Sequence, residues 1–191
     1  IKLSPIILEA KKHKSFNVHI CSTGQHKEML KQALDSFELS PNTDLKLMSH
    51  NQTLAGFSSR ALIEIDNIFT KIKPDIVIVQ GDTTTSFIGA LAAFYRNVKI
   101  GHVEAGLRTY NKQNPFPEEI NRRLTADLAD FHFAPTIDSK KALLRENIED
   151  DKIWVTGNTV VDAINIIKDK SLKLKREDFD EFSKEIVDML F

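Results

Sequence analysis

The sequence predicts an α/β protein built on a doubly wound, mainly parallel, Rossmann-like sheet. Apolar runs typical of buried strands alternate with helical patterns almost to the end of the chain. Two such runs, residues 75–80 and 98–103, are separated by the helical pattern of residues 83–96. Because a right-handed crossover returns the chain in parallel, both strands should end at the same edge of the sheet. A chain of 191 residues, 41% of them hydrophobic, can bury one sizeable core.

The other elements follow from the same two patterns. Apolar residues three or four positions apart indicate helices, and short apolar runs between polar or turn residues indicate strands. Pro5 fits the first turn of a helix, and Gly157 marks the turn that precedes the last expected helix. The remaining helices are expected at residues 1–14, 25–38, 52–72, 117 to about 130, 136–147 and 160 to about 170, and the remaining strands at 16–21, 44–48, 131–134 and 153–155.

The chain divides into one domain and a terminal segment. Residues 1–170 are expected to form a Rossmann-like domain that lacks its first strand, because such a domain usually starts with a strand and this chain starts within a helix. Residues 171–191 are charged and then amphipathic. An amphipathic stretch needs a partner surface, so we expect this segment to lead to an absent C-terminal domain.

The composition argues against several classes of partner. A formal net charge of −1 gives no electrostatic reason to bind nucleic acid or an anionic membrane. No apolar run approaches the roughly 20 residues of a membrane span. The one cysteine, Cys21, lies in a strand-like run and is expected to be a buried free thiol, which fits a reducing cytoplasm.

Three acidic residues stand at the ends of successive elements. Asp82 follows the apolar run at 75–80, Glu104 follows the next run, and Glu118 lies at the expected start of a helix. Carboxylates held close together raise one another's pKa, which gives an enzyme a general base and a general acid near neutral pH. The three acids therefore indicate a candidate active site at the carboxyl edge of the sheet.

Each of these residues also has a structural interpretation. Asp82 and Thr83 are suited to cap the following helix, although Thr83 can instead offer its hydroxyl to an anion at the helix N-terminus. Glu104 would be costly to bury unpaired, and Arg108 is its obvious candidate partner. Glu118 is favoured by the helix dipole alone. The convergence of three acids at one edge is what favours a site.

Other polar residues are weaker candidates. His102 belongs either to the core or to the site, and His26 is expected at the same edge because it opens a helix after a strand. Arg122 and Arg123 either balance the acidic charge, hold a substrate anion or lie on the surface. No zinc spacing, Walker loop or G-x-G-x-x-G motif is present, so no metal or dinucleotide cofactor is expected.

Seven segments resemble, in order, the non-hydrolysing UDP-N-acetylglucosamine 2-epimerases of bacteria. Together they cover nearly the whole chain, which makes the resemblance highly specific. The segments are Thr23–Met29, Gly81–Thr85, Leu91–Tyr95, Gly101–Arg108, Pro117–Arg123, His132–Thr136 and Val155–Ala163.

The resemblance implies the N-terminal half of a two-domain enzyme of the GT-B type. The family interconverts UDP-GlcNAc and UDP-ManNAc by eliminating UDP, forming 2-acetamidoglucal, and adding UDP back to the opposite face, for cell-surface polysaccharide precursors. Its C-terminal domain carries most UDP contacts and a catalytic histidine, so this chain is expected to be inactive alone. A UDP-sugar partner, a homodimer and a cytoplasmic location are also implied.

The family's functional residues can be carried over by motif. Its catalytic carboxylates fall on Asp82, Glu104 and Glu118, with base and acid left unassigned. The substrate-binding residues implied by the resemblance are Lys2, Arg108, His102, Thr83 and Asn121.

A second ligand pocket is also implied. In some bacterial members a second UDP-GlcNAc molecule activates the enzyme, and Gln25 and His26 match that allosteric pocket. Glu28 and Asn51 stand where members with this regulation often have Gln and Arg.

Several alternatives remain at this point. The closest is a 2-epimerase of a modified UDP-sugar, of the 2,3-diacetamido uronic acid type, because few pocket residues set sugar specificity. Residues 117–123 argue against a hydrolysing epimerase, and a GT-B glycosyltransferase gives no reason for three carboxylates. A non-catalytic nucleotide-sugar-binding module is the alternative from another class; UDP binding by the isolated domain would favour it.

Overall fold

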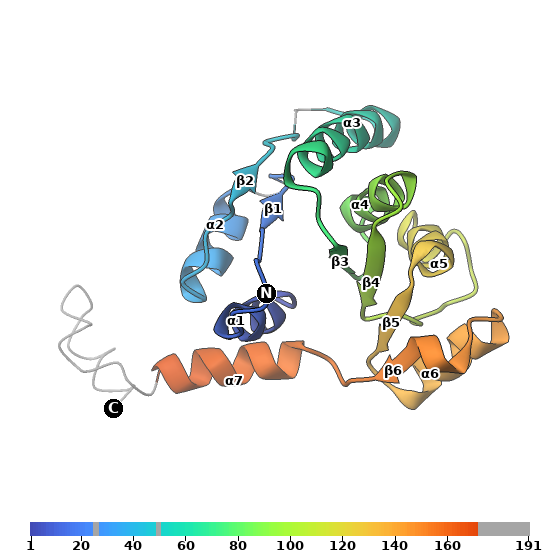
Figure 1. Ribbon diagram of the computed structural model, residues 1–191. Helices are drawn as coiled ribbons and strands as arrows, with labels where there is room; N and C mark the ends of the chain where they lie inside the picture. The colour runs from blue at the N-terminus through green and yellow to red at the C-terminus, as the bar shows by residue number, and fades with distance from the viewer. Residues whose placement is uncertain (25–26, 49–50, 172–191) are drawn as a thin grey trace, which may run out of the picture.

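The computed structural model describes residues 1–24, 27–48 and 51–171. Helices and strands alternate through these residues, as the sequence predicts (Figure 1). The helices are α1 (Ser4–Lys12), α2 (Lys27–Ser36), α3 (Leu54–Ile72), α4 (Thr84–Tyr95), α5 (Glu118–Leu128), α6 (Ile137–Arg145), the 3-10 helix η1 (Asp150–Lys152) and α7 (Val160–Ser171). The strands are β1 (Cys21–Ser22), β2 (Thr43–Asp44), β3 (Ile76–Gln80), β4 (Lys99–Val103), β5 (Phe131–Ala134) and β6 (Ile153–Val155).

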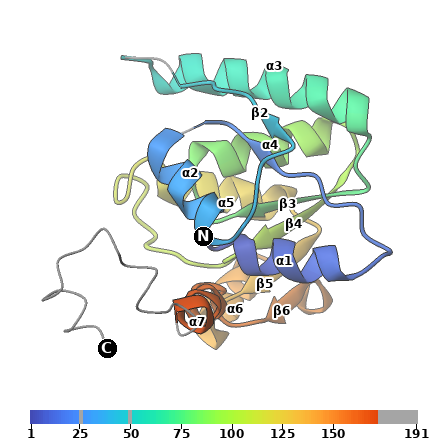
Figure 2. The same cartoon turned by 90° about the vertical axis from the view of Figure 1, so that its left-hand side faces the viewer.

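The strands form two parallel sheets. β1 pairs with β2, whereas β3, β4, β5 and β6 pair in chain order, and every pair is parallel. Within the described ranges no ladder joins β1 to β3, and Figure 1 shows the two sheets as separate units. Figure 2 shows the strands β3 to β6 of the large sheet following one another in order. The expected α/β class with parallel strands is confirmed, but the expected single sheet is divided in two.

The small sheet departs most from the sequence prediction. Its strands were expected at 16–21 and 44–48, yet they lie at Cys21–Ser22 and Thr43–Asp44, and the ladder between them has only two residue pairs. Cys21 was expected to be buried, and this is wrong: the alternation along β1 buries Ser22 and exposes Cys21. In contrast, β5 and β6 have the predicted limits.

The main core lies between α3, α4 and the first two strands of the large sheet. Thr53 and Thr83 cap α3 and α4 by accepting hydrogen bonds from the N–H groups of Gly56 and Ser86. Small residues on α4 allow the close approach of its neighbours. The buried members of this core include Phe57, Ala61, Ile65, Val79, Ile88, Ala90, Ala93 and Ile100.

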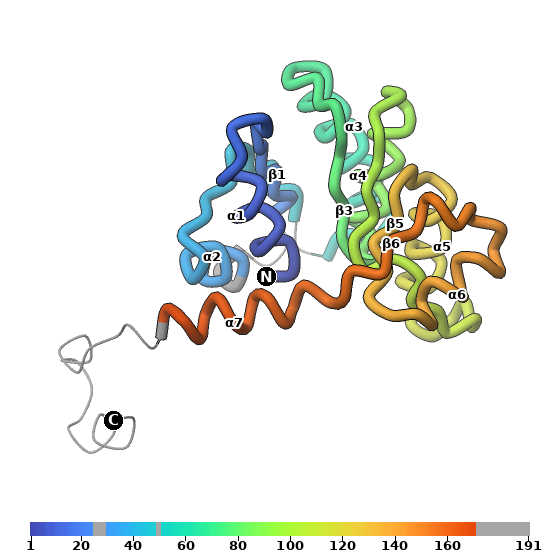
Figure 3. The backbone as a smooth tube through the Cα atoms, turned by 60° about the horizontal axis from the view of Figure 1, so that its bottom comes forward, coloured from blue at the N-terminus to red at the C-terminus, as the bar shows by residue number. Residues whose placement is uncertain are grey.

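The last helix connects the two parts of the molecule. After β6, α7 leaves the large sheet and packs along α1 (Figure 3). A small core of Phe37, Leu39 and Ala163 lies there. None of the helices in the described ranges is long and apolar enough to cross a membrane.

Candidate active site

The structure brings the three predicted acids together at the carboxyl edge of the large sheet. The chain leaves β3 through Gly81, which has φ 71°, and leaves β4 through Glu104, which has φ 66°. The N–H of Gly81 donates to the carbonyl of Val103 at 2.9 Å and holds the two turns side by side. Glu118 opens α5, and the charges of Glu118 and Glu104 both act on Asp82.

Glu104 is enclosed by hydrogen-bond donors. Lys2 Nζ lies 2.6 Å from Oε1 and 2.8 Å from Oε2. Gln80 Nε2 donates to Oε2 at 2.5 Å, and Asn158 Nδ2 donates to Oε1 at 3.1 Å. The Glu104 side chain is 9% exposed and that of Lys2 is 36% exposed. These donors fix the carboxylate and hold a partly accessible ammonium beside it. The partner of Glu104 is therefore Lys2, not Arg108.

Asp82 is held by an arginine. Arg122 Nη2 lies 2.7 Å from Asp82 Oδ2. Burial raises the pKa of Asp82, the charge of Arg122 opposes this, and the charges of Glu118 and Glu104 raise the pKa further, so that it lies above its ordinary value. A carboxyl group with a raised pKa holds its proton more readily than an ordinary aspartate, which suits it to proton exchange.

Two of the predicted substrate ligands support the backbone around Asp82. Asn121 Nδ2 donates to the carbonyl of Asp82 at 3.0 Å. The hydroxyl of Thr83 accepts the N–H of Ser86 at 3.2 Å and so caps α4, while Thr83 as a whole remains exposed. The structure shows these supporting contacts, and direct contacts with substrate stay a prediction.

His102 lies beneath the site. Its side chain is completely buried, and Nε2 donates to the carbonyl of Gly81 at 2.8 Å. Burial is the main cause that lowers its pKa to about 4, so the ring is neutral at pH 7. His102 therefore supports the turn at Gly81, and its predicted contact with substrate stays a prediction.

Arg108 forms a buried ion pair with Glu146. Its side chain is 1% exposed, and Nε and Nη2 donate to the Glu146 carboxylate at 2.9 and 2.7 Å. Nη1 donates to the carbonyl of Leu107 at 2.8 Å. The guanidinium thus ties the loop after β4 to the end of α6, and the predicted contact of Arg108 with substrate stays a prediction.

Glu119, which the sequence did not single out, anchors the loop between Glu104 and α5. It is fully buried and accepts the N–H groups of Thr109 at 3.0 Å and Tyr110 at 2.9 Å. Burial opposes ionisation, but these hydrogen bonds and the charge of Arg122 hold the pKa of Glu119 below its ordinary value. Glu119 therefore keeps the loop against α5.

Sequence reasoning missed the contacts of Gln80, Asn158 and Glu119 and left the role of Arg122 open. Gln80 carried one usable signal, because it is the polar last residue of a buried strand. Asn158 stands in the turn before α7, where polar residues are common for structural reasons alone. The candidate allosteric residues Gln25 and His26 lie outside the described residues.

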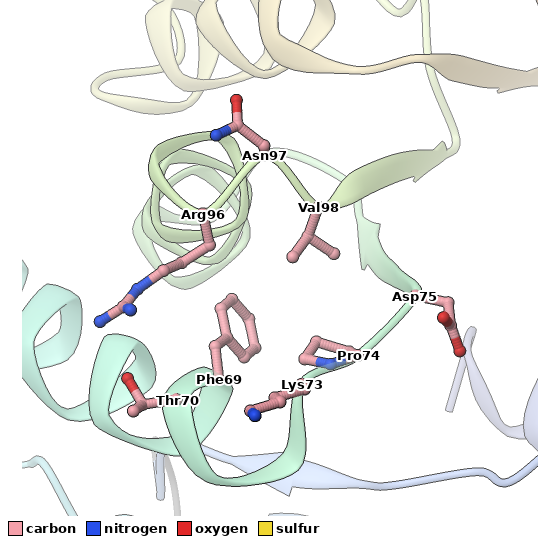
Figure 4. A pocket seen from close by; sticks show the side chains of 8 residues that line it. All are labelled: Phe69, Thr70, Lys73, Pro74, Asp75, Arg96, Asn97 and Val98. Atoms are coloured by element: carbon pink, nitrogen blue, oxygen red, sulfur yellow. The ribbon is translucent and has the colours of Figure 1, made fainter.

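A hollow lies at the opposite edge of the sheet. It has about 480 Å³ and sits where α3 and α4 end and β3 and β4 begin (Figure 4). Its charged residues include Arg96, which is paired with Asp66. We place the active site by its chemistry and not by volume. The lining residues are Phe69, Thr70, Lys73, Pro74, Asp75, Arg96, Asn97 and Val98.

These features define a Rossmann-like α/β domain with carboxylates gathered at the carboxyl ends of its parallel strands. Within the described ranges no group of three or more His, Cys, Asp or Glu side chains is arranged to hold a metal ion. The sequence model of the UDP-N-acetylglucosamine 2-epimerases matches residues 8–189. The chain belongs to this family.

Individual relatives agree with the family assignment. The UDP-N-acetylglucosamine 2-epimerase of Bacillus subtilis is 54% identical over 86% of this chain and 43% of its own length. The Neisseria meningitidis enzyme, solved with UDP-GlcNAc bound, matches with a TM-score of 0.87 and 48% identity over 90% of this chain and 47% of that one. The Methanocaldococcus jannaschii enzyme, solved with UDP-GlcNAc and UDP, matches with a TM-score of 0.84 and 41% identity over 91% of this chain and 48% of that one.

The chain thus spans about half the length of the curated relatives it matches. The expected fold class, the parallel α/β half of a GT-B-type epimerase, is confirmed by these structures. What the relatives bind as whole proteins bears on this chain only as a proposal.

Proposed function

We propose that the complete protein is a UDP-N-acetylglucosamine 2-epimerase that interconverts UDP-GlcNAc and UDP-ManNAc. The observation that carries this proposal is the convergence of Asp82, Glu104 and Glu118 in a chain of this family. The binding of UDP-GlcNAc by the Neisseria and Methanocaldococcus relatives supports a UDP-sugar as substrate.

The reaction needs groups that the site offers. Elimination removes the proton from C2 and breaks the C1–O bond to UDP, giving 2-acetamidoglucal and UDP. Re-addition forms the C1–O bond again and returns a proton to C2 from the opposite face. The steps need a base, an acid and a cation near the departing diphosphate.

The environments of the carboxylates suggest a division of these roles. Asp82, whose pKa is raised, suits proton exchange at C2, and Glu118 supplies a second carboxyl group beside it. The Glu104 carboxylate accepts hydrogen bonds from three side chains, so we assign it the role of holding the Lys2 ammonium in position. The ammonium of Lys2 is partly exposed and suits the negative charge of UDP.

Proton NMR of UDP-GlcNAc incubated with the complete protein in deuterated water tests this function. Formation of UDP-ManNAc with deuterium at C2 is the expected result. Unchanged UDP-GlcNAc after long incubation would contradict it and would redirect the search to modified UDP-sugars. Release of free ManNAc would instead identify a hydrolysing enzyme.

We also propose that a first strand of the domain inserts between β1 and β3. Both strands have a single described neighbour, so the other edge of each, including that of the apolar strand β3, is unpaired within the described residues. Buried parallel strands need partners on both sides, so one added strand would join the two sheets. A crystal structure of the complete protein would test this, and β1 paired directly with β3 would contradict it.

A homodimer is the third part of the proposal. Leu54 and Ile63 of α3 are 48% and 60% exposed, and such apolar side chains are candidate contacts. Light scattering of the complete protein should give twice the monomer mass, and Ile63→Glu should lower it. A monomeric wild-type protein would contradict this proposal.

A further inference from the structure

We propose that Arg122 is a positioning residue of this active site, holding the Asp82 carboxylate in place and tying it to the loop between Glu104 and Glu118. The inference rests on the proposed function, because it concerns the same site. It adds a residue that supports the chemistry without touching the substrate.

The first step is the position of the guanidinium. The Arg122 side chain is 10% exposed and lies between two carboxylates: Nη2 is 2.7 Å from Asp82 Oδ2, and Nε is 3.6 Å from Glu119 Oε2. Nε makes no hydrogen bond in the described structure. A buried guanidinium is costly unless charges compensate it, so this position is maintained by the two acids.

The second step is the connection from Glu119 to the loop. Glu119 accepts the N–H groups of Thr109 and Tyr110, and its own N–H donates to the carbonyl of Pro115 at 3.1 Å. Tyr110, which is 58% exposed, belongs to the same loop. Displacement of Arg122 would therefore disturb both Asp82 and this loop.

The third step is the balance of charge around Asp82. The groups that face its carboxylate are Arg122 from α5, Glu118 from the first turn of α5, and Glu104 after β4, which itself binds Lys2. Arg122 is the cation in this set that lowers the pKa of Asp82, whereas burial and both glutamates raise it. Without Arg122 the remaining influences would move the pKa of Asp82 further up.

The neighbouring arginine offers a matched control. Arg123 is on the same helix, but its side chain is 49% exposed and its nearest acid, Glu146, is 4.0 Å away. Replacing Arg123 removes the same charge from the adjacent position without removing a contact to Asp82. The comparison separates a local effect from a general change of charge.

The test uses the complete protein with 13C-labelled aspartate and the variants Arg122→Gln, Arg122→Lys and Arg123→Gln. The Asp82 carboxyl signal is assigned by its loss in Asp82→Asn, and its titration is followed by NMR without substrate. We expect the midpoint to move to higher pH in Arg122→Gln, to return toward wild type in Arg122→Lys, and to stay unchanged in Arg123→Gln. In epimerisation assays Arg122→Gln should lower kcat about tenfold or more and change KM little, because the inference assigns Arg122 to positioning Asp82 and not to binding substrate.

An unchanged Asp82 titration in Arg122→Gln, with a native circular dichroism spectrum, would overturn the inference. If Arg122→Gln does not fold, the titration of Arg122→Lys serves as the test. The lysine ammonium should lie farther from the Asp82 carboxylate than the guanidinium does, so the midpoint of Asp82 should still move upward relative to wild type. The titration needs no turnover, so failure of the wild-type protein to epimerise UDP-GlcNAc would contradict the proposed function and leave this test valid.

Discussion

Ion pairs stand at both edges of the large sheet, but their surroundings differ. At the carboxyl edge, Glu104 and Arg122 each expose 10% or less of the side chain while paired with Lys2 and Asp82. At the amino edge, Arg96 and Asp66 are 41% and 35% exposed, and Lys99 and Asp130 are 64% and 31% exposed. Lys2 and Asp82 are still 36% and 30% exposed, so one partner of each pair is withdrawn from water at the carboxyl edge, whereas both partners are solvated at the amino edge.

The pKa shifts show what this difference does. The pKa of Asp66 is lowered, first by its hydrogen bond to Arg96, and that of Asp130 is also lowered because Lys99 and the N–H of Ile100 outweigh burial. The pKa of Asp82 moves upward despite its arginine, because burial and two further carboxylates outweigh the pair. Pairing lowers the pKa of Asp66 and Asp130 at the amino edge, whereas at Asp82 it only limits an upward shift that favours proton exchange.

The largest expected effect is on catalysis at the carboxyl edge. Asp82→Asn, Glu104→Gln and Glu118→Gln in the complete enzyme should abolish turnover, with losses of about 10²–10⁴-fold for each group that transfers a proton. NMR rates of UDP-ManNAc formation give the measurement, and circular dichroism should show an intact fold. A variant with a wild-type rate would remove that residue from the mechanism.

The buried ion pair between Arg108 and Glu146 should contribute more to stability than the exposed pairs do. Arg108→Gln leaves Glu146 without its buried partner and should lower the free energy of unfolding by about 3 kcal/mol, measured by urea denaturation of the complete protein. The double variant Arg108→Leu, Glu146→Leu should recover part of this loss, because no uncompensated charge remains. Equal destabilisation in both proteins would show that packing, and not charge, is what Arg108 provides.

The buried histidines should make the fold sensitive to acid. His102 and His132 are completely buried, and burial is the main cause that lowers both pKa values to about 4. The unfolded chain binds these protons near pH 6.5, before the folded chain does. Their contribution to stability is therefore complete above about pH 6.5 and is lost as the pH falls toward 4.

Urea midpoints of the complete protein at pH 7 and pH 5 measure this loss. His102→Gln should reduce the difference between the two midpoints. Identical pH dependence in wild type and His102→Gln would exclude His102 as a source of the acid sensitivity.

The smallest effect is expected at the amino edge. Arg96→Gln removes a solvated ion pair with Asp66, and exposed pairs contribute little to stability. The urea midpoint and the epimerisation rate of the complete protein should both match wild type. A clear loss of either would mean that the two edges are coupled and that the contrast between them is incomplete.

The sequence by itself determined the parallel α/β alternation, the limits of β5 and β6, and the convergence of Asp82, Glu104 and Glu118 at one edge. These are local properties: periodicity marks the strands, and a residue directly after a parallel strand must lie at its carboxyl edge. It could not determine the division into two sheets, because strand pairing depends on distant segments.

Only the tertiary structure decided the partners of the charged residues. Glu104 binds Lys2, 102 positions away, and Arg108 binds Glu146, 38 positions away, so no spacing rule could have paired them. The burial of His102 is equally a result of packing, since a strand pattern alone leaves a histidine free to face either the core or the site. Charge acquires its chemical role here from burial and from distant neighbours, and both exist only once the chain has folded.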